Sequence, residues 1–533
     1  MPRTIKDLFA ACDADRQGIL ETVRECARLT DHSLLPPKDH DSNQPLPGNY
    51  QSDGSQGLTA LSGKVMLQAF PPGKPWVKQD LDAKVMFDPN VSDEQKIALQ
   101  EALFVEDMIL TSLIEKAGGT GGNDNVTGFY ANVNSFFRQA IGTGDALCRV
   151  DDDFQLTVFR RDQYVTVRDT AKRVLCHIVK ERQDPFSLPD KEQARLWSDH
   201  ADIKSKKSED YTRDRQVDVY TLVEWDAVNK RWATKREVDL NGKTVVVGEY
   251  TDEVTPYISC YWSLDAGEHY GRGLIEQNMG SLKSLDMLSM YILDFCDLAS
   301  KAHFVVDSAS DFDEKNLERP SGAIYRGRVR DGVVTDVAIL RTDKSNEFMI
   351  AKDGLEITRA NFGRASLSST GAVRNSERTT AFEIDNTSLQ ELQNATSGFF
   401  ASLADQFQMP LYRRVKWMAR SKGLINTDYD QKGIKPVILT GLQDIASKVR
   451  FQSMLTLKDL AQGLGDTALA RINMDTLLES AARFLGVWEP GLIKSREQMQ
   501  AEIEQAMQLA ARQQATETAI TTAGKVAENK ATQ

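Results

Sequence analysis

The stretch EHYGRGLIEQNMGSLKSLDML, residues 268–288, decides the fold of this sequence. A turn with two glycines opens it, and the helical pattern that follows continues through SMYILDFCDLASKA, residues 289–302. Apolar residues recur at helical spacing along this helix, and a polar stripe separates them. The stripe consists of Lys283, Asp286, Asp294, Asp297 and Lys301. A helix that is apolar around much of its girth must be buried on several sides, either in a large core or against other subunits.

The turn that opens this helix holds Arg272 between Gly271 and Gly273. Glycines at such a turn indicate a sharp change of direction, where a side chain would crowd the backbone. We expect the chain to arrive there from the last strand of a preceding β region. On periodicity alone, two alternatives remain for the helix: a closed ring of subunits, which its single wet face favours, and the core of a large monomer.

The composition of the 533 residues narrows the class of protein. A chain of this length predicts several domains, because it exceeds one ordinary core. The net charge of −12 argues against charge-driven wrapping of nucleic acid over the whole surface, although a local basic ring or loop remains possible. The six cysteines lack CxxC spacing, which favours buried thiols over a zinc or disulfide scaffold. We expect neither a signal peptide nor a membrane span, because no apolar stretch is long enough.

The period of the apolar residues divides the chain before the glycine turn into two regions. Helices are expected at 4–29, 58–70, 92–116 and 126–141. Between 146 and 250 the period changes to two, which predicts antiparallel strands joined by hairpins. The charged residues 198–216 are expected to form an exposed loop.

After the long helix, the sequence predicts a short β insert and a return to helices. The insert covers 304–340 and has a hairpin at Asp331 and Gly332. The elements expected next are a helix at 345–365, a polar loop, a long helix at 379–421 that Pro410 should kink, a lone strand at 435–441, and helices from 442 onward. The fold class is therefore α+β.

No catalytic, metal or nucleotide motif is complete in this sequence. The segment GTGD, residues 142–145, lacks the Lys-Ser/Thr pair of a phosphate-binding loop. Cys176 and His177 are adjacent on a predicted strand, so their side chains point to opposite faces. The acidic residues 151–153 are the first suspects for an unrecognised hydrolase or nuclease, although a solvated turn explains them better. We therefore expect no enzyme activity, no metal and no cofactor.

Four segments, taken in order, resemble the head-to-tail connector, or portal, proteins of short-tailed bacteriophages. They are LSGKVMLQAFPPGKPWVK (61–78), GEHYGRGLIEQNMGSLKSLDML (267–288), NSERTTAFEI (375–384) and ILTGLQDI (438–445). The most specific pieces are the YGRG turn with its GSLKSL helix, and ERTTAFEI. The segment ERTTAFEI can also be explained simply as the start of a well-capped helix after Glu377. Thr379 or Thr380 can cap the N-terminus of that helix, and Glu383 stands at capping-box spacing from Thr380.

The resemblance implies a ring of typically twelve copies at one capsid vertex, through which DNA is packaged and ejected. It also implies an order of parts along the chain. These parts are a mixed α/β wing (1–270), a first stem helix (271–303), a small β clip (304–341), a second stem helix (342–365), a channel loop (366–378), a long wing helix with a returning strand (379–441), and a helical crown with a C-terminal tail (442–533).

The resemblance also suggests which residues meet DNA and which meet the motor and the tail. A sparse basic collar on a negative channel wall would consist of Arg364, Arg374 and Arg378, with Lys283 and Lys301 as further channel residues. Alternatively, the arginines pair with acids of neighbouring subunits. In the clip, Arg326, Arg328 and Arg330 alternate on one strand, so their side chains share a face that either docks a partner or is merely solvated.

The implied partners are those of phage assembly. The chain would form a homododecamer around double-stranded DNA and would contact the terminase large subunit, scaffolding and coat proteins, tail adaptor and tube proteins, and internal core proteins. It would occupy the unique vertex of the virion after assembly in the host cytoplasm. The rival within structural proteins is a self-assembling tail or scaffold component without a DNA channel.

Overall fold

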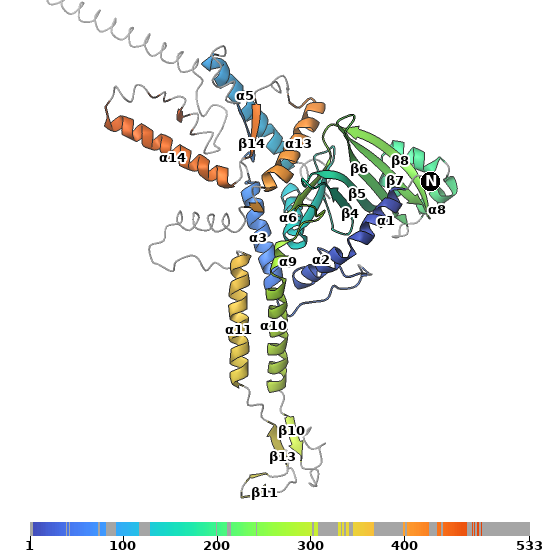
Figure 1. The fold of residues 1–533 in the computed structure, drawn as a ribbon, viewed down its shortest axis with the longest axis vertical. Helices are drawn as coiled ribbons and strands as arrows, with labels where there is room; N and C mark the ends of the chain where they lie inside the picture. The colour runs from blue at the N-terminus through green and yellow to red at the C-terminus, as the bar shows by residue number, and fades with distance from the viewer. Residues whose placement is uncertain are drawn as a thin grey trace, which may run out of the picture. The chain divides into compact units, whose positions relative to one another are not determined.

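The computed structural model of the chain is mixed α/β and contains several sheets (Figure 1). It divides into two compact units, Met1–Gly441 and Leu442–Gln533. The residues that it describes are 4–38, 40–41, 43–72, 75–81, 92–116, 128–198, 200–209, 215–240, 242–300, 303–306, 329–331, 333–334, 337–340, 345–366, 398–399, 402–425, 434–438, 441–465 and single positions between 472 and 481. No described helix is both long and apolar enough to cross a membrane.

The expected N-terminal helix is two helices, α1 (Ile5–Asp15) and α2 (Gln17–Leu29). Thr4 caps α1 in a capping box with Asp7. The single-helix prediction is wrong because Arg16 leaves the helical conformation, with φ −100° and ψ 6°. Its guanidinium turns inward and donates hydrogen bonds to the carbonyl oxygens of Arg161 and Tyr164. The break therefore lets a buried arginine reach the β region.

The largest hydrophobic core joins helices from both halves of the first unit. Its helices are α3 (Asp53–Ala69), α5 (Asp93–Lys116), α6 (Phe129–Thr143) and α13 (Met409–Ser421). Phe136 stacks on Phe407 with ring centroids 4.3 Å apart, and Phe70 meets the same ring edge-on at 5.8 Å. Residues early and late in the sequence therefore share one core.

Two antiparallel sheets form the β region, as the alternating pattern predicted. The three-stranded sheet has the order β3-β2-β9, formed by Leu156–Phe159, Asp145–Val150 and Tyr257–Tyr261. The five-stranded sheet has the order β4-β5-β6-β7-β8, formed by Tyr164–Arg168, Val174–Gln183, Val217–Asp226, Arg231–Leu240 and Lys243–Asp252.

The five-stranded sheet is covered on both faces. On one face, Ile5 and Phe9 of α1 pack with Ile178 and Tyr220. On the other face, part of the sheet packs against the three-stranded sheet, and another part packs against α7 (Asp190–Trp197). Successive residues of a strand point to opposite faces of the sheet, so one strand contributes side chains to the hydrophobic core on each face.

The prediction of a loop at 198–216 is wrong for Ala201–Glu209, which form helix α8. Its Ile203 packs, partly buried, against the core of Leu196 and Trp197. The helix has too few apolar residues to show a period, although its alanine, lysines and glutamate favour a helix intrinsically.

A helical hairpin follows the glycine turn, with β strands at its far end (Figure 1). The short helix α9 (Leu274–Gln277) precedes α10 (Met279–Ser300), and α11 (Ser345–Ala365) returns beside α10, with the bounds expected for it. Between the two long helices, β10 (His303–Val306) pairs with β13 (Val337–Leu340), and β11 (Val329–Arg330) pairs with β12 (Val333–Val334). Asp331 has a φ of 53° between β11 and β12, which confirms the predicted hairpin.

The segment around Pro410 differs from the expected kinked helix. A π-helical turn, Ala404–Gln408, lies directly before α13, and Pro410 falls in the first turn of α13. Proline is tolerated there because the first amides of a helix have no intrahelical acceptor. Most of the expected helix at 379–421 before residue 402 lies outside the described residues.

The strand expected to be alone has a partner. β14 (Ile434–Ile438) pairs antiparallel with β1 (Val77–Leu81), which the sequence did not predict. Helix α14 (Gly441–Gly463) follows and agrees with the expected return to helix.

A buried carboxyl beside β1 makes stability depend on pH. Asp107 of α5 accepts hydrogen bonds from the backbone N and Nε2 of Gln79, at 2.9 and 3.0 Å, and Glu106 pairs with Lys416 nearby. Burial raises the pKa of Asp107 from 3.8 to about 7.

The folded protein therefore keeps a proton that the unfolded chain has already lost, and this contribution to stability disappears as the pH rises through about 7. We expect Asp107→Asn, which stays neutral, to flatten the decrease in the urea midpoint between pH 5 and pH 8. An unchanged slope would contradict the assignment.

Candidate functional site

The turn before the helical hairpin is a close approach of three glycines. A Cβ on Gly271 would lie 2.5 Å from the carbonyl oxygen of Gly144, and a Cβ on Gly273 would lie 2.9 Å from the Gly144 nitrogen. Gly144, with φ +86°, ends α6 in the left-handed region that favours glycine. Arg272 donates its backbone N–H to Ser263 at 2.7 Å. The backbone of this turn is therefore packed directly on the start of β2.

The side chains before the turn fasten it to β4. The ring of Tyr270 lies under the buried guanidinium of Arg161, 4.1 Å from ring centroid to Cζ, and burial raises the pKa of Tyr270. Arg168 donates its backbone N–H to Nδ1 of His269 and its Nη1 to the His269 carbonyl. The same Nη1 bonds to Asp145 at 2.8 Å, in a fully buried ion pair. The direction in which the hairpin leaves the β region is thus set by buried charges.

The first half of α10 is held against α2. Leu282 and Leu285 share a core with Leu29 of α2 and with Leu355 and Phe362 of α11.

Two members of the polar stripe on α10 are also engaged with α2. Asp286 pairs with Arg28 at 3.0 Å, and Lys283 pairs with Glu25 at 3.3 Å. The hydrogen bond from Arg28 is the largest cause that lowers the pKa of Glu25.

The outer side of the hairpin exposes large apolar side chains. Ile350 and Ile357 of α11 are 71% and 63% exposed. Their spacing of seven residues places them on one face of the helix, two turns apart. The other exposed members of this set are Met287, Tyr291, Leu293 and Met349. Inside the hairpin, Phe295 stacks on Phe348, so the two helices already bury one face against each other.

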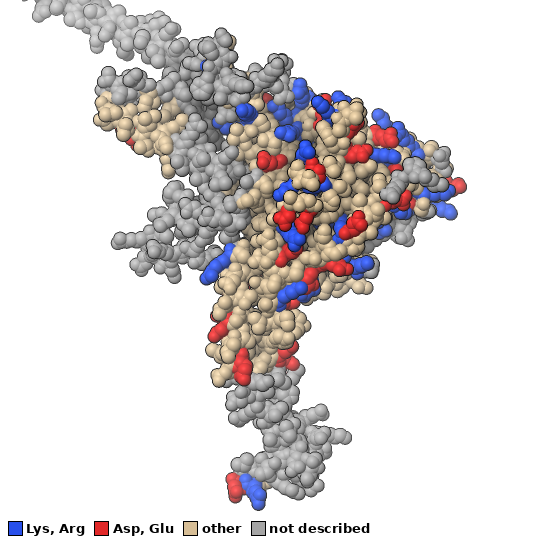
Figure 2. Space-filling model, viewed as in Figure 1, with Lys and Arg blue, Asp and Glu red and all other residues tan. Residues whose placement is uncertain are grey.

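Acidic side chains gather at the described end of the hairpin that leads to the β strands (Figure 2). The opposite end carries both signs, since Lys283 and Asp286 both lie there. Arg359 pairs with Asp53 at 2.8 Å, and Arg364 is exposed with no ion pair to any described residue. The acidic members are Asp294, Asp297, Glu347, Asp353 and Glu356, with Lys352 among them.

The chain is similar to known proteins over most of its length. A model of the family "Bacteriophage head to tail connecting protein" matches residues 3–493. The chain belongs to this family. It is 25% identical to the portal protein of Escherichia phage T7, over 95% of this chain and 91% of the relative. It is also 25% identical to the portal proteins of Enterobacteria phage T3, over 91% and 87%, and Pseudomonas phage phiKMV, over 88% and 87%.

Three of the residues predicted to meet DNA or a docking partner lie in described segments of this connector chain. Lys283 is paired with Glu25, Arg364 ends α11 in an exposed position, and Arg330 is exposed on β11. The structure does not bring these three together. Outside the described residues lie Lys301, Arg326, Arg328, Arg374, Glu377, Arg378, Thr379, Thr380 and Glu383.

The residues suspected of catalysis have structural partners in the connector. Asp151 accepts hydrogen bonds from backbone N–H groups of its own turn, and Asp152 and Asp153 pair with Arg414 and Lys422. Burial lowers the pKa of His177 to about 3, and its Nδ1 lies 3.0 Å from the hydroxyl of Thr166. Among the described residues, no group of three or more acids, histidines and cysteines could hold a metal ion.

Sequence reasoning missed several residues on which the connector site depends. Gly144 belongs to the GTGD segment, and nothing in the sequence around it signals its contact with Gly271. The Asp145–Arg168 pair joins two strands and has no local pattern. The exposed isoleucines could have been found, because Ile350 and Ile357 stand at heptad spacing in the helix expected at 345–365.

Proposed function

We propose that this chain is a portal subunit whose copies close into a ring at one vertex of a phage capsid. DNA would enter through the ring during packaging and leave through it during ejection. The family is described as a head to tail connecting protein, which is a structural role, and the relatives are portal proteins. The observation that carries the ring is the exposed apolar surface of the α10–α11 hairpin.

The parts of a portal can be proposed from the order of elements. The hairpin of α10 and α11 would be the stem, and the paired strands β10 to β13 would be the clip. The helices and sheets before residue 271, with α13 and β14, would be the wing. The channel loop at 366–378, apart from Ser366, and most of the crown at 442–533 fall outside the described residues and remain assignments by sequence.

The proposed stem has apolar surface that nothing in a single chain covers. A single hairpin leaves Ile350 and Ile357 in water, although burying one such side chain contributes about 1.5–3 kcal/mol. Exposed apolar residues lie on α10 as well as on α11. A contact between the α11 face of one copy and α10 of the next is heterologous, and its repetition produces a ring when the rotation between copies closes. The proposed number of copies, twelve, comes from the family resemblance.

The charge distribution favours a channel in which DNA slides. Phosphate contacts by lysine and arginine provide most of the sequence-independent affinity, so a wall with few cations holds the duplex weakly. The net charge of −12 and the acidic lower hairpin fit such a wall. Arg364, Arg374 and Arg378 would supply a sparse basic collar, with Lys301 as a further cation, whereas Lys283 is already paired with Glu25.

Imaging and mass determination of the purified chain test the ring first. We expect a closed ring with a channel wide enough for a DNA duplex. A ring or assembly without such a channel would favour a tail or scaffold component instead. A compact monomer at every concentration and salt condition would contradict a self-assembling ring.

The basic collar predicts a change in salt dependence. We expect Arg374→Gln with Arg378→Gln to make DNA binding by rings less dependent on salt. Each lost phosphate contact reduces the magnitude of the slope of log K against log salt by about 0.9. Arg182→Gln is the control, since Arg182 is exposed on β5 in the proposed wing. An unchanged slope in the double variant would show that these arginines pair with acids of neighbouring subunits.

The clip is the proposed docking site for the packaging motor and later the tail. Arg330 is exposed on β11, and Arg326 and Arg328 precede it at alternate positions. A shared basic face suits an acidic partner surface. The proposed partners are the terminase large subunit, the tail adaptor and tube proteins, scaffolding and coat proteins, and internal core proteins.

A further inference from the structure

A polar pocket of about 470 Å³ lies between α2 and the proline-rich segment that follows it. Part of its lining is the polar face of α2, which packs beside α10 (Figure 1). Glu21, Arg24, Glu25 and Arg28 share this face because they stand at positions i, i+3, i+4 and i+7 of the helix. The segment after α2 supplies the rest of the lining.

One group of charges beside the pocket is already balanced within the chain. Arg28 pairs with Glu25 and with Asp286, each at 3.0 Å, and Lys283 pairs with Glu25 at 3.3 Å. This group contains two cations and two carboxylates, so it adds no net charge to the pocket.

Two further cations in the pocket lack such partners. Arg24 is half-buried on α2, and Lys38 is exposed on the segment that follows. Neither side chain forms an ion pair or a hydrogen bond with a described residue. Glu21 is exposed at the same pocket and is not paired with a described residue either, although its spacing from Arg24 would allow an ion pair. The unpaired groups therefore leave an excess of positive charge.

His32 adds a neutral hydrogen-bonding group to the pocket. Its side chain is 8% exposed, and its ring nitrogens form no hydrogen bond with a described residue. Burial, followed by the charge of Arg28, lowers the pKa of His32, so its ring is uncharged at pH 7. A neutral imidazole keeps one N–H donor. The pocket thus offers three donors from three different side chains.

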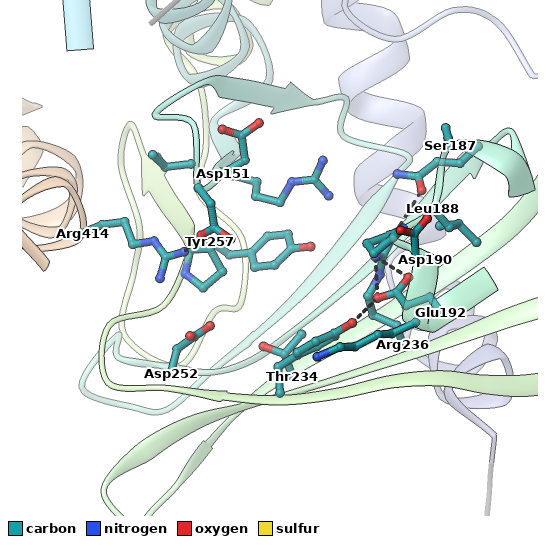
Figure 3. Close-up of a pocket in the computed structure, with 18 residues that line it drawn as sticks. Asp151, Ser187, Leu188, Asp190, Glu192, Thr234, Arg236, Asp252, Tyr257 and Arg414 are labelled. Atoms are coloured by element: carbon teal, nitrogen blue, oxygen red, sulfur yellow. Dashed lines mark hydrogen bonds and ion pairs between the residues drawn. The ribbon is translucent and has the colours of Figure 1, made fainter. Parts of the chain in front are cut away.

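A larger cleft of about 860 Å³ in the β region lacks this feature (Figure 3). Its three arginines are each paired with a carboxylate of the chain, and the pairs are Arg149 with Glu181, Arg236 with Glu192, and Arg414 with Asp152. The dashed lines in Figure 3 include the contacts of Arg236 with Glu192. These guanidinium groups are already occupied, whereas Arg24 is available to a ligand.

We propose that the pocket beside α2 binds a phosphate monoester that carries an organic group of about nucleoside size. The phosphate carries a charge of about −1.5 to −2 at pH 7, and Arg24 and Lys38 balance it. Its three terminal oxygens accept hydrogen bonds from Arg24, Lys38 and His32, one for each donor. A carboxylate, with two oxygens and one charge, would leave one of these donors unused.

The size and the remaining lining of the pocket fit the organic group. A volume of about 470 Å³ lies within the range of roughly 300–1,000 Å³ that is typical of small-molecule sites. Pro37 and Pro47 are exposed and supply apolar surface beside the cations. A phosphate ion alone would not use this surface.

Two molecules present this chemistry: a free nucleoside monophosphate and the 5′-phosphate at the end of a DNA strand. The site goes beyond the proposed portal role, because none of its three donors belongs to the exposed apolar face that would close the ring. Its test can therefore fail while the ring survives.

Calorimetric titration of the full-length chain tests the site. The probes are adenosine monophosphate and adenosine, which differ only in the phosphate. We expect the monophosphate to bind at least tenfold more tightly than adenosine. Arg24→Gln should weaken binding of the monophosphate roughly tenfold or more, and Lys38→Gln about three- to tenfold, as expected for lost hydrogen bonds to a charged group. Equal binding of the two probes would overturn the proposal.

Two further variants show whether the effect is local to the pocket. Glu21→Gln removes a carboxylate that repels the phosphate, so we expect binding to become about two- to fivefold tighter. Lys204→Gln is the control, because Lys204 is exposed on α8 and lies outside this pocket. A loss of affinity in Lys204→Gln as large as that in Lys38→Gln would show that only the overall charge attracts the nucleotide, and would overturn the site.

Melting temperatures separate binding from folding. Arg24 has no partner among the described residues, so we expect Arg24→Gln to melt at an unchanged temperature. If it melts lower, Lys38→Gln decides the question, because Lys38 is exposed and its loss should leave the fold intact. Unchanged affinity in a folded Lys38→Gln variant would then contradict the proposed contact.

Competition with oligonucleotides identifies the source of the phosphate. One oligonucleotide carries a 5′-phosphate, and its matched partner carries a 5′-hydroxyl. Displacement of adenosine monophosphate by the phosphorylated strand alone supports a DNA end as the ligand, and displacement by neither strand supports a free nucleotide. Equal displacement by both strands would show that internal phosphodiesters bind, and would overturn the preference for a monoester.

Discussion

Ile350→Asp combined with Ile357→Asp is expected to convert rings into monomers. Both side chains are largely exposed in the single chain, so the variant should fold with an unchanged circular dichroism spectrum. In a ring, each interface would lose about 3–6 kcal/mol of apolar burial from the two isoleucines and would gain two unpaired carboxylates that cost several kcal/mol more. An interface weakened by that amount dissociates at least a thousandfold more readily. Mass photometry at micromolar concentration measures the outcome.

Val228→Asp is the control for this experiment. Val228 is 90% exposed in the turn between β6 and β7, far along the chain from the hairpin. The same change of an exposed apolar residue to aspartate should leave the ring intact there. Rings that persist in the double isoleucine variant would show that the apolar face of α11 is not an interface.

Gly144→Ala is expected to produce the largest loss of stability of any single substitution considered. A Cβ at this position would lie 2.3 Å from the carbonyl oxygen of Gly271 and 2.6 Å from the nitrogen of Gly273. Both neighbours are backbone atoms of the glycine turn, and the buried contacts of Tyr270 and Arg168 fasten this turn to the β region. The turn therefore cannot shift away from a new Cβ without breaking these contacts. The positive φ adds about 1–2 kcal/mol, and the forced displacement brings the expected total to roughly 3–5 kcal/mol.

Gly242→Ala isolates the conformational part of that effect. Gly242 has φ +85°, nearly the same as Gly144, but a Cβ there would meet nothing within 4 Å. We expect a loss of only about 1–2 kcal/mol. The urea midpoints of both variants, measured in the monomeric Ile350→Asp, Ile357→Asp background, give the comparison. Equal losses would contradict the proposed backbone clash.

The sequence predicted those elements whose signal is local. The helix Ser345–Ala365 and the hairpin at Asp331 were confirmed because periodicity, a polar boundary and an Asp-Gly pair lie within a few residues. The antiparallel strands were confirmed for the same reason. Helix α8 was missed because it has almost no apolar face, and the pairing of β1 with β14 was missed because no local pattern reports a partner more than 300 residues away.

The candidate site was predicted to a smaller extent. The glycine turn stood out by composition, but the atoms that crowd it belong to Gly144, which the sequence offers only as an ordinary turn. The polar stripe on α10 is only partly the exposed face that the sequence predicted, because Asp286 is buried whereas Met287 and Tyr291 are exposed. Its Lys283 and Asp286 proved to be paired with α2, because tertiary packing supplies partners that helical spacing cannot show.

The pairing of β10 with β13 has a consequence for how relatives diverge. The two strands bring residues 303–306 beside residues 337–340, so the intervening segment leaves and rejoins the molecule at one place. A segment attached in this way can lengthen, shorten or be exchanged while the rest of the chain keeps its geometry. Natural selection can therefore adapt the strand end of the hairpin to new partners almost independently of the remaining structure. A chimera that exchanges only this segment between two relatives should inherit the docking preference of the relative that donates the segment.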